Sequence, residues 1–175
     1  MKIFSNDPEA FKSVYGQTFP IIVRVAYHIT QDIEVAEDIC QEAFIRFYNR
    51  SLPFPCEDQA RYWLIRVTKN LAFNFYKRRK REKNALEKYS HEAKNRPRNG
   101  EETVMRSETE KIVHEALDKL PPKLRSVIIL KEYGNLSYRE IGAILHITEN
   151  NVKVRVHRAR NMLETLLKEE EAHVL

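Results

Sequence analysis

The amino-acid sequence predicts an all-α protein made of two small helical domains that a flexible linker joins. Apolar residues recur at helical spacing along almost all of the 175 residues. Only four glycines are present, too few for many short strands joined by glycine turns or for a glycine-rich phosphate loop. A polar stretch at residues 91–102 interrupts the periodicity. We therefore expect domains at residues 1–84 and 107–170 with a linker at residues 85–106, although the first half of the linker also fits a surface helix that ends near Ala93.

Capping and turn residues place the individual helices. Asp7 precedes Pro8, which is an N-cap followed by a proline at the first helical position, and two prolines at positions 53 and 55 force a loop. Ser107 and Ser137 each stand three residues before a glutamate, the arrangement of a capping box. The expected helices cover about residues 8–30, 33–49, 59 to beyond 81, 107–120, 123–133, 138–145 and 149–168.

Charge and cysteine usage exclude several classes of protein. Lys and Arg number 30 against 25 Asp and Glu, so nucleic-acid binding depends on where the basic residues cluster. Cys40 and Cys56 form no C-x-x-C pair and are expected to be reduced thiols of a cytoplasmic protein. Neither a signal peptide nor a stretch of 18 apolar residues is visible, so no membrane insertion is expected. Scattered histidines and the lack of a nucleophile signature predict no enzyme, no metal and no cofactor.

The C-terminal residues have the pattern of a helix-turn-helix, with a short helix from Tyr138, a turn of about three residues and a longer helix after Thr148. The apolar stripe of the longer helix consists of Val152, Val156, Ala159 and Leu163. The opposite half holds Asn150, Asn151, Val154, His157, Arg158 and Asn161, flanked by Lys153, Arg155 and Arg160. Arg, Lys and Asn read base edges, and residues 153–160 contain four Lys or Arg and no acid. This face therefore favours binding in a DNA major groove over a merely solvated basic helix.

The second helix has one apolar side and one acidic side. The apolar side consists of Val35, Ile39, Ala43 and Phe47. The other side consists of Glu34, Asp38, Gln41, Glu42 and Ile45. An acidic surface with one bare isoleucine is more typical of a protein-docking face than of a DNA-binding face, and the pattern alone also fits a solvated helix side.

The third helix mixes aromatic and cationic residues. The mixture consists of Arg61, Tyr62, Trp63, Arg66, Lys69, Asn70, Phe73, Asn74, Tyr76, Lys77 and Arg78. Cations bind phosphates while aromatic and amide groups take unstacked bases, so this helix suits separated strands better than closed duplex. Trp63, Leu64, Val67 and Leu71 repeat at helical spacing, and we therefore interpret Trp63 as mainly structural.

Several strings in this order resemble the extracytoplasmic-function (ECF) sigma factors, a family of RNA polymerase subunits. Residues 120–125 (LPPKLR), 136–142 (LSYREIG) and 151–160 (NVKVRVHRAR) resemble sigma region 4, the helix-turn-helix module. Residues 36–44 (AEDICQEAF) and 54–70 are similar to sigma region 2, a helical bundle. The resemblance extends over about residues 8–83 and 107–167 and implies an alternative sigma factor that binds core RNA polymerase and directs promoter-specific initiation.

The resemblance implies three sets of site residues. The −35 promoter element would be contacted by Tyr138, Asn151, Lys153, Val154, Arg155, His157 and Arg158. The −10 element would be recognised and melted by Phe54, Asp58, Arg61, Tyr62, Arg66, Asn70, Asn74, Lys77 and Arg78, with the loop at 54–58 and Asn70 holding a flipped base. The clamp helices of the polymerase largest subunit would dock on Asp38, Gln41, Glu42 and Ile45. The family also implies an anti-sigma partner and a role in stress response.

Three positions depart from the family pattern. His146 stands where the family usually has a glycine in the turn, and residues 149–151 replace the usual small-residue start of the recognition helix. Residues 55–57 replace a typical Arg-Gly-acid string in the base-holding loop. The turn and the preferred promoter bases therefore need not match those of the family. A helix-turn-helix regulator that acts without being a polymerase subunit is the alternative; it accounts for the last 60 residues or so but not for the aromatic-basic helix or the acidic face.

Overall fold

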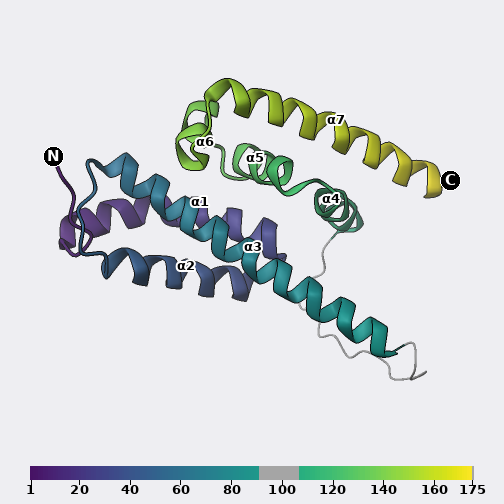
Figure 1. Cartoon of the computed structure of the whole chain (residues 1–175), viewed down its shortest axis with the longest axis horizontal. Coiled ribbons are helices and arrows are strands. Elements are labelled where there is room, and N and C mark those ends of the chain that lie inside the picture. Colours follow the sequence, from purple (N-terminus) through teal and green to yellow (C-terminus); the bar gives the residue numbers. More distant parts are fainter. Residues whose placement is uncertain (91–106, 175) are drawn as a thin grey trace.

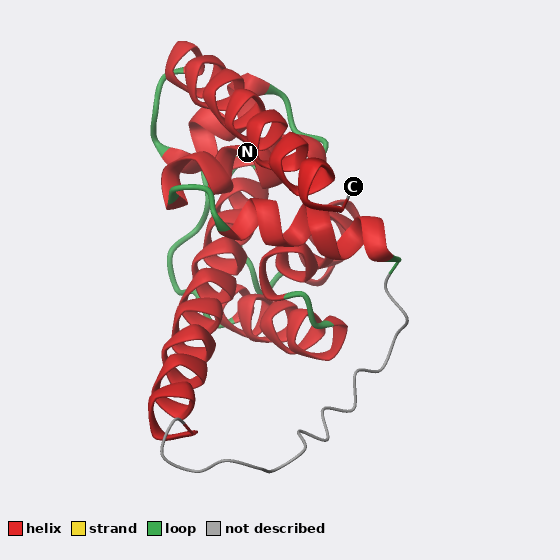
Figure 2. Cartoon of the chain, turned by 90° about the vertical axis from the view of Figure 1, so that its right-hand side faces the viewer, coloured by secondary structure: helices red, strands yellow, loops and turns green. Residues whose placement is uncertain are grey.

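The computed structural model describes residues 1–90 and 107–174, and every regular element in these ranges is a helix (Figure 1, Figure 2). The first domain consists of α1 (Pro8–Thr30), α2 (Ile33–Tyr48) and α3 (Glu57–Ser90). The second consists of α4 (Glu108–Asp118), α5 (Pro122–Glu132), α6 (Tyr138–Leu145) and α7 (Glu149–Val174). The predicted all-α class with two helical domains is confirmed.

Side-chain caps begin the helices at the positions that the sequence indicates. The Asp7 carboxylate accepts a hydrogen bond from the backbone N–H of Ala10 at 2.9 Å. Asp32 caps α2 in the same way, and Ser107 caps α4. Ser137 forms a complete capping box at the start of α6. These caps satisfy N–H groups that have no partner inside their helices, so each helix has a defined start.

α3 takes the helical alternative for the first half of the expected linker, and α7 is longer than the sequence indicates. α3 continues through residues 85–90, the beginning of the expected linker, and the remaining linker residues lie outside the described ranges. α7 continues to Val174, past the expected end near residue 168. Lys119, the C-cap residue of α4, forms an ion pair with Glu170 at 2.9 Å. The last turns of α7 have a polar and acidic sequence. This ion pair with a residue near the end of α4 supports them.

Buried apolar side chains of both domains belong to one cluster. Fully buried side chains of the first domain include Ile22, Ile29, Phe47, Leu64 and Ile65. Those of the second domain include Ile129, Leu130, Ile141, Ile144 and Val152. None of the described helices combines the length and the apolar character needed to span a membrane. Within the described ranges, no three His, Cys, Asp or Glu residues are grouped so that they could hold a metal ion.

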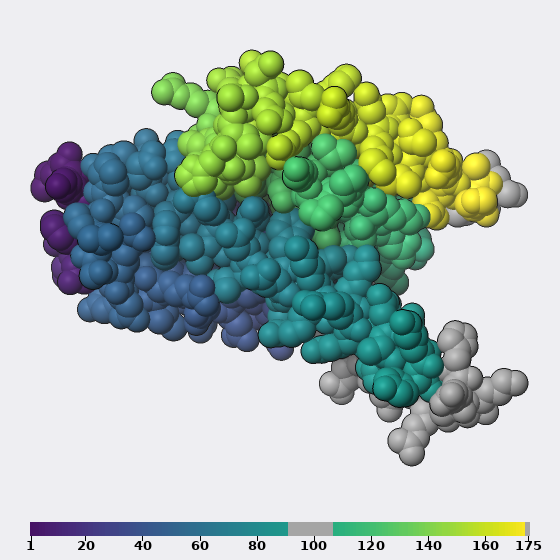
Figure 3. Space-filling view, in the orientation of Figure 1, coloured from purple at the N-terminus to yellow at the C-terminus, as the bar shows by residue number. Residues whose placement is uncertain are grey.

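The two domains pack against each other. In Figure 3 the second domain, green to yellow, lies against one side of the first, and the C-terminal end of α3 projects beyond both. Most of the backbone contacts between the domains join α3 to α6 and α1 to α5. The ring of His28 on α1 stacks on the ring of Tyr133 at the end of α5, with 3.4 Å between their centroids. The described residues therefore form one body with an interface between its two domains.

Candidate nucleic-acid interface

α6 and α7 form the predicted helix-turn-helix, and its turn is held by close backbone packing. The backbone N–H of Ser137 donates to the Glu140 carboxylate at 2.8 Å while the Ser137 hydroxyl accepts from the N–H of Glu140 at 3.2 Å. His146 ends α6 in the left-handed conformation, with φ 55° and ψ 43°. A non-glycine residue adopts this conformation at some energetic cost. The turn nevertheless forms with His146 at the position where the family pattern led us to expect a glycine.

The recognition helix α7 separates its apolar and polar residues as its sequence predicts. Val152, Val156 and Ala159 are buried, and Leu163 is half-buried. The solvent face consists of Asn150, Asn151, Lys153, Val154, His157, Arg158 and Asn161. Among the described residues, Arg158 forms no ion pair, whereas Lys153 lies 3.4 Å from Glu149. Arg158 is therefore the cation on this face whose charge is least compensated within the protein.

Several of the predicted −35 residues already contact other side chains within the second domain. The Arg155 guanidinium donates to the side-chain oxygen of Asn151 at 2.9 Å, so these two side chains are held together on the face of α7. The Lys131 ammonium lies 4.8 Å from the centre of the Tyr138 ring. This cation places a positive charge beside the start of α6, where a phosphate would lie if Tyr138 contacts one.

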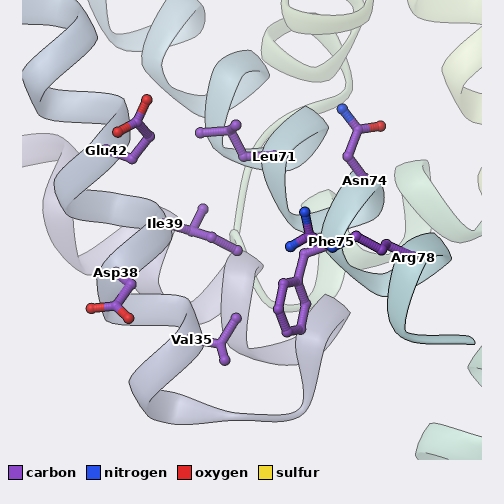
Figure 4. Close-up of a pocket in the computed structure, with 8 residues that line it drawn as sticks. All are labelled: Val35, Asp38, Ile39, Glu42, Leu71, Asn74, Phe75 and Arg78. Atoms are coloured by element: carbon purple, nitrogen blue, oxygen red, sulfur yellow. The ribbon is translucent and has the colours of Figure 1, made fainter. Parts of the chain in front are cut away.

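The acidic side of α2 is open to solvent. Asp38, Gln41, Glu42 and Ile45 are all exposed, and the Ile45 side chain retains 56% of its accessible surface. Beside this surface a shallow pocket lies between α2 and α3 (Figure 4). Its walls consist of Val35, Asp38, Ile39, Glu42, Leu71, Asn74, Phe75 and Arg78. The carboxylates of α2 therefore face solvent next to an apolar hollow, which is a surface suited to a protein partner.

The loop between α2 and α3 is fixed to the N-terminal segment. Ile3 and Phe54 exchange two backbone hydrogen bonds of 2.8 Å, forming an isolated antiparallel bridge. The Phe54 ring is buried, with 4% exposure, and lies 5.7 Å from the Trp63 ring. The Arg50 guanidinium covers the Phe54 ring at 4.6 Å. Phe54 and Trp63 therefore support the loop from beneath, which agrees with the structural interpretation of Trp63, and in this conformation no base can reach the Phe54 ring.

The predicted −10 residues of α3 lie on two sides of the helix. Asn70, Asn74, Lys77 and Arg78 are exposed to solvent, and Asp58 forms an ion pair with Arg61 at 3.2 Å. Tyr62 and Arg66 instead face α6 of the second domain. The Arg66 guanidinium donates to the carbonyl oxygens of Ile144 at 2.6 Å and Ala143 at 3.2 Å. The structure thus brings part of the predicted −10 set to an open surface and places another part in the domain interface.

Burial changes the acid–base behaviour of side chains on the covered side of α3. Desolvation lowers the pKa of the Lys69 ammonium, and the nearby positive charges of Arg66 and Lys77 lower it further. Burial raises the pKa of Tyr62, and the carboxylates of Asp58 and Glu140 add to this effect. Glu140 belongs to α6, so the start of the helix-turn-helix lies near Tyr62. This side of α3 therefore concentrates positive charge in a partly dehydrated place.

The sequence interpretation did not identify Arg125 as a special residue. Its side chain is buried with 3% exposure, pairs with Asp118 at 2.9 Å and lies 4.2 Å from the centre of the Tyr76 ring. Its guanidinium also donates to the carbonyl oxygen of Ile29 in the other domain at 3.2 Å. The sequence did contain a signal for this buried ion pair, an arginine within the apolar run of residues 124–130. An arginine is almost never fully buried without partners.

Comparisons with known proteins agree with this architecture. Family models match residues 14–82, as Sigma-70 region 2, and residues 110–163, as Sigma-70, region 4. The chain is 30% identical over 177 residues to the ECF RNA polymerase sigma factor SigW of Bacillus subtilis (strain 168), covering 96% of this chain and 94% of the relative. The chain belongs to the ECF RNA polymerase sigma factors. This sigma factor is also 34% identical over 136 residues to the ECF RNA polymerase sigma-E factor of Escherichia coli (strain K12), covering 73% of this chain and 71% of the relative.

Solved structures show the same fold for this sigma factor. The sigma factor RpoE in complex with the anti-sigma factor NepR from Bartonella quintana matches with a TM-score of 0.60 and 24% identity, over 90% of this chain and 96% of that one. CnrH in complex with the cytosolic domain of CnrY matches with a TM-score of 0.63 and 23% identity, over 94% and 92%. As a family member, the protein is an alternative sigma factor, a non-enzymatic DNA-binding subunit that directs transcription.

Proposed function

We propose that this sigma factor binds core RNA polymerase through α2 and directs initiation by holding a duplex −35 element and an opened −10 element. The observation that carries the proposal is the presence, on one chain, of an exposed basic recognition helix and a separate acidic helix face. The first suits paired DNA, and the second suits a protein partner.

The recognition helix supports duplex binding through its charge and shape. Arg158 and His157 lie exposed on the same side of α7, and Val154 offers an exposed methyl surface between them and the helix start. A side chain with two donors can bind a guanine edge, and an apolar side chain can contact a thymine methyl. The helix therefore has the chemical groups to read a −35 sequence directly.

The open side of α3 supports capture of an unpaired strand. Asn70, Asn74 and Lys77 are exposed on successive turns, so amide groups and a cation follow one line along the helix. The loop at residues 50–56 lies at the start of this helix and is fixed by its bridge to Ile3. We place the flipped base near this loop, with exposed loop residues rather than the Phe54 ring at its edge.

The acidic face supports docking on a larger protein, which we take to be the clamp helices of polymerase. Exposed Ile45 offers apolar area at the edge of the carboxylates of Asp38 and Glu42. Binding to polymerase would hold both DNA-binding sites near the promoter and so raise their effective concentration there. Neither site then needs to bind DNA tightly by itself. Two solved neighbours contain anti-sigma or cytosolic partner chains. We therefore propose an anti-sigma protein as the second partner. We also propose that the protein acts in the cytoplasm, where polymerase acts.

The test is run-off transcription with purified core polymerase, together with a pull-down of the core. Wild-type protein is expected to bind the core and support initiation at a specific promoter. Ile45→Arg is expected to weaken core binding by about 1–2 kcal/mol, because it removes an apolar contact from the docking face. Leu86→Arg is the matched control, since Leu86 is exposed to a similar extent (63%) at the projecting end of α3. Absence of core binding by the wild-type protein would contradict the proposal.

A further inference from the structure

The N-terminal segment before α1 carries an exposed aromatic residue, Phe4, on a fixed backbone. Ile3 is held by its two backbone hydrogen bonds to Phe54, and Figure 1 shows this end of the chain beside the loop between α2 and α3. Ser5 is buried with 1% exposure, and its hydroxyl donates to the carbonyl oxygen of Arg50 at 3.1 Å. Phe4 therefore lies between two anchored residues, although it is itself 53% exposed.

The register of the bridge places the Phe4 side chain on the outer face of the loop. Successive side chains of an extended segment point to opposite faces, so Phe4 and Lys2 point away from the side that Ile3 takes. Ile3 and Phe54 stand opposite each other and point inward, since Ile3 is half-buried and Phe54 is buried. Phe4 and Lys2 are both exposed, as is Pro55, the loop residue opposite Lys2. The outer face of the loop therefore includes two side chains from the N-terminal segment.

These two side chains supply what the loop itself lacks for binding an unpaired base. Phe54 is the only aromatic residue in the string at 51–58, and it is buried with 4% exposure. Proteins bind unpaired bases by stacking them on aromatic faces while cations hold the phosphates. Phe4 offers such a face and Lys2 offers a cation, beside the loop where we place the flipped base. Because the backbone of Phe4 is already fixed, little conformational freedom remains to be lost when a base binds.

We propose that Phe4 stacks on the flipped base of the −10 strand, so that the N-terminal segment forms part of the base-binding site. The proposal rests on the proposed function for the identity of the ligand, an unpaired DNA base. Ile3 and Ser5 are positioning residues in this site, because they hold Phe4 in place without touching the base. The loop can thus hold a base although its own ring, that of Phe54, is turned into the core.

The test uses the full-length protein bound to core polymerase and measures promoter opening by the permanganate reactivity of unpaired thymines. Phe4→Ala is expected to lower the equilibrium constant for opening by about five- to 150-fold, the range that corresponds to the loss of one base–aromatic stack. Phe4→Tyr keeps an aromatic face and should open the promoter as the wild type does, whereas Phe4→Leu, which is apolar without such a face, should not. Tyr48→Ala is the matched control, since Tyr48 is exposed to a similar extent (55%) and its ring lies against Phe11.

A template whose −10 segment is already unpaired by mismatches separates base capture from other defects. On this template, run-off by Phe4→Ala at saturating protein should recover towards the wild-type yield, and its affinity for core polymerase should be unchanged throughout. Opening by Phe4→Leu equal to that by Phe4→Tyr, or by Phe4→Ala equal to that by Tyr48→Ala, would overturn the assignment of Phe4. Absence of initiation by the wild-type protein would instead contradict the proposed function, and this proposal with it, before any variant is compared.

Discussion

The backbone of Gly142 on α6 packs directly against the carbonyl of Ile147 in the turn. The N–H of Ile147 donates to the carbonyl oxygen of Gly142 at 3.0 Å, and a Cβ atom at position 142 would lie 2.8 Å from the Ile147 oxygen. A backbone atom cannot move aside as the end of a flexible side chain can. The angle between α6 and α7, on which presentation of the recognition helix depends, is therefore set by the absence of a side chain at this position.

Gly142→Ala is expected to destabilise the second domain by about 1–3 kcal/mol, the usual cost of forcing an extra methyl group into a packed site. Thermal and urea unfolding would measure the loss. Gly16→Ala serves as the control, because no atom lies within 4 Å of a Cβ built at that exposed position in α1. Ala is favoured over Gly inside a helix, so this control should be neutral or more stable by up to about 1 kcal/mol. Equal stabilities for the two variants would contradict the packing argument.

Phe54→Ala tests whether this residue acts in the core or on DNA. The ring is buried against Trp63 and Phe47, so its removal should lower the free energy of unfolding by about 3–5 kcal/mol. Phe4→Ala, at a neighbouring aromatic residue that is 53% exposed, should change stability by less than about 1 kcal/mol. If Phe54→Ala kept wild-type stability and lost only promoter opening, a direct contact with a base would be the better interpretation.

Arg158→Ala should weaken binding of the −35 duplex by about 1–3 kcal/mol if the guanidinium contacts a base, and should relax selection at one base pair. Binding to duplexes with single substitutions, measured by fluorescence anisotropy at fixed salt, would show both effects. Lys168→Ala removes one positive charge from the same helix, at a residue that is paired with Glu164 at 2.6 Å and lies on the distal part of α7. This control should leave base selection unchanged. An Arg158→Ala protein with wild-type base preference would contradict the assigned role.

The two cysteines should differ sharply in reactivity with a maleimide. Burial raises the pKa of the Cys40 thiol to about 12, and the nearby Glu37 carboxylate adds to this effect. The thiolate is the reactive form, so at pH 8 only on the order of one Cys40 in ten thousand is ionised. Cys56 is exposed and should react readily. Mass spectrometry should find one adduct in the native wild type, none in Cys56→Ser and two after unfolding in urea; rapid native labelling of Cys56→Ser would contradict the prediction.

The sequence by itself determined the local structure and the separation of faces. The caps at Asp7 and Ser137 were recognisable, because an N-cap is satisfied by residues within one turn of it. The stripe of Val152, Val156 and Ala159 was predictable for a similar reason, since helical period alone decides which residues share a face. The same reasoning predicted the exposed acids of α2 and the exposed cations of α7.

Only the tertiary structure decided which of these faces are free. Tyr62 and Arg66 belong to the aromatic-basic set by composition, yet they face α6, while Asn70 and Asn74 remain open. The buried position of Arg125 depends on the carbonyl of Ile29, which is 96 residues away along the chain. Helical period places a side chain on one side of its own helix but cannot state what lies opposite. That depends on how two domains meet, which follows from contacts between residues far apart in the sequence.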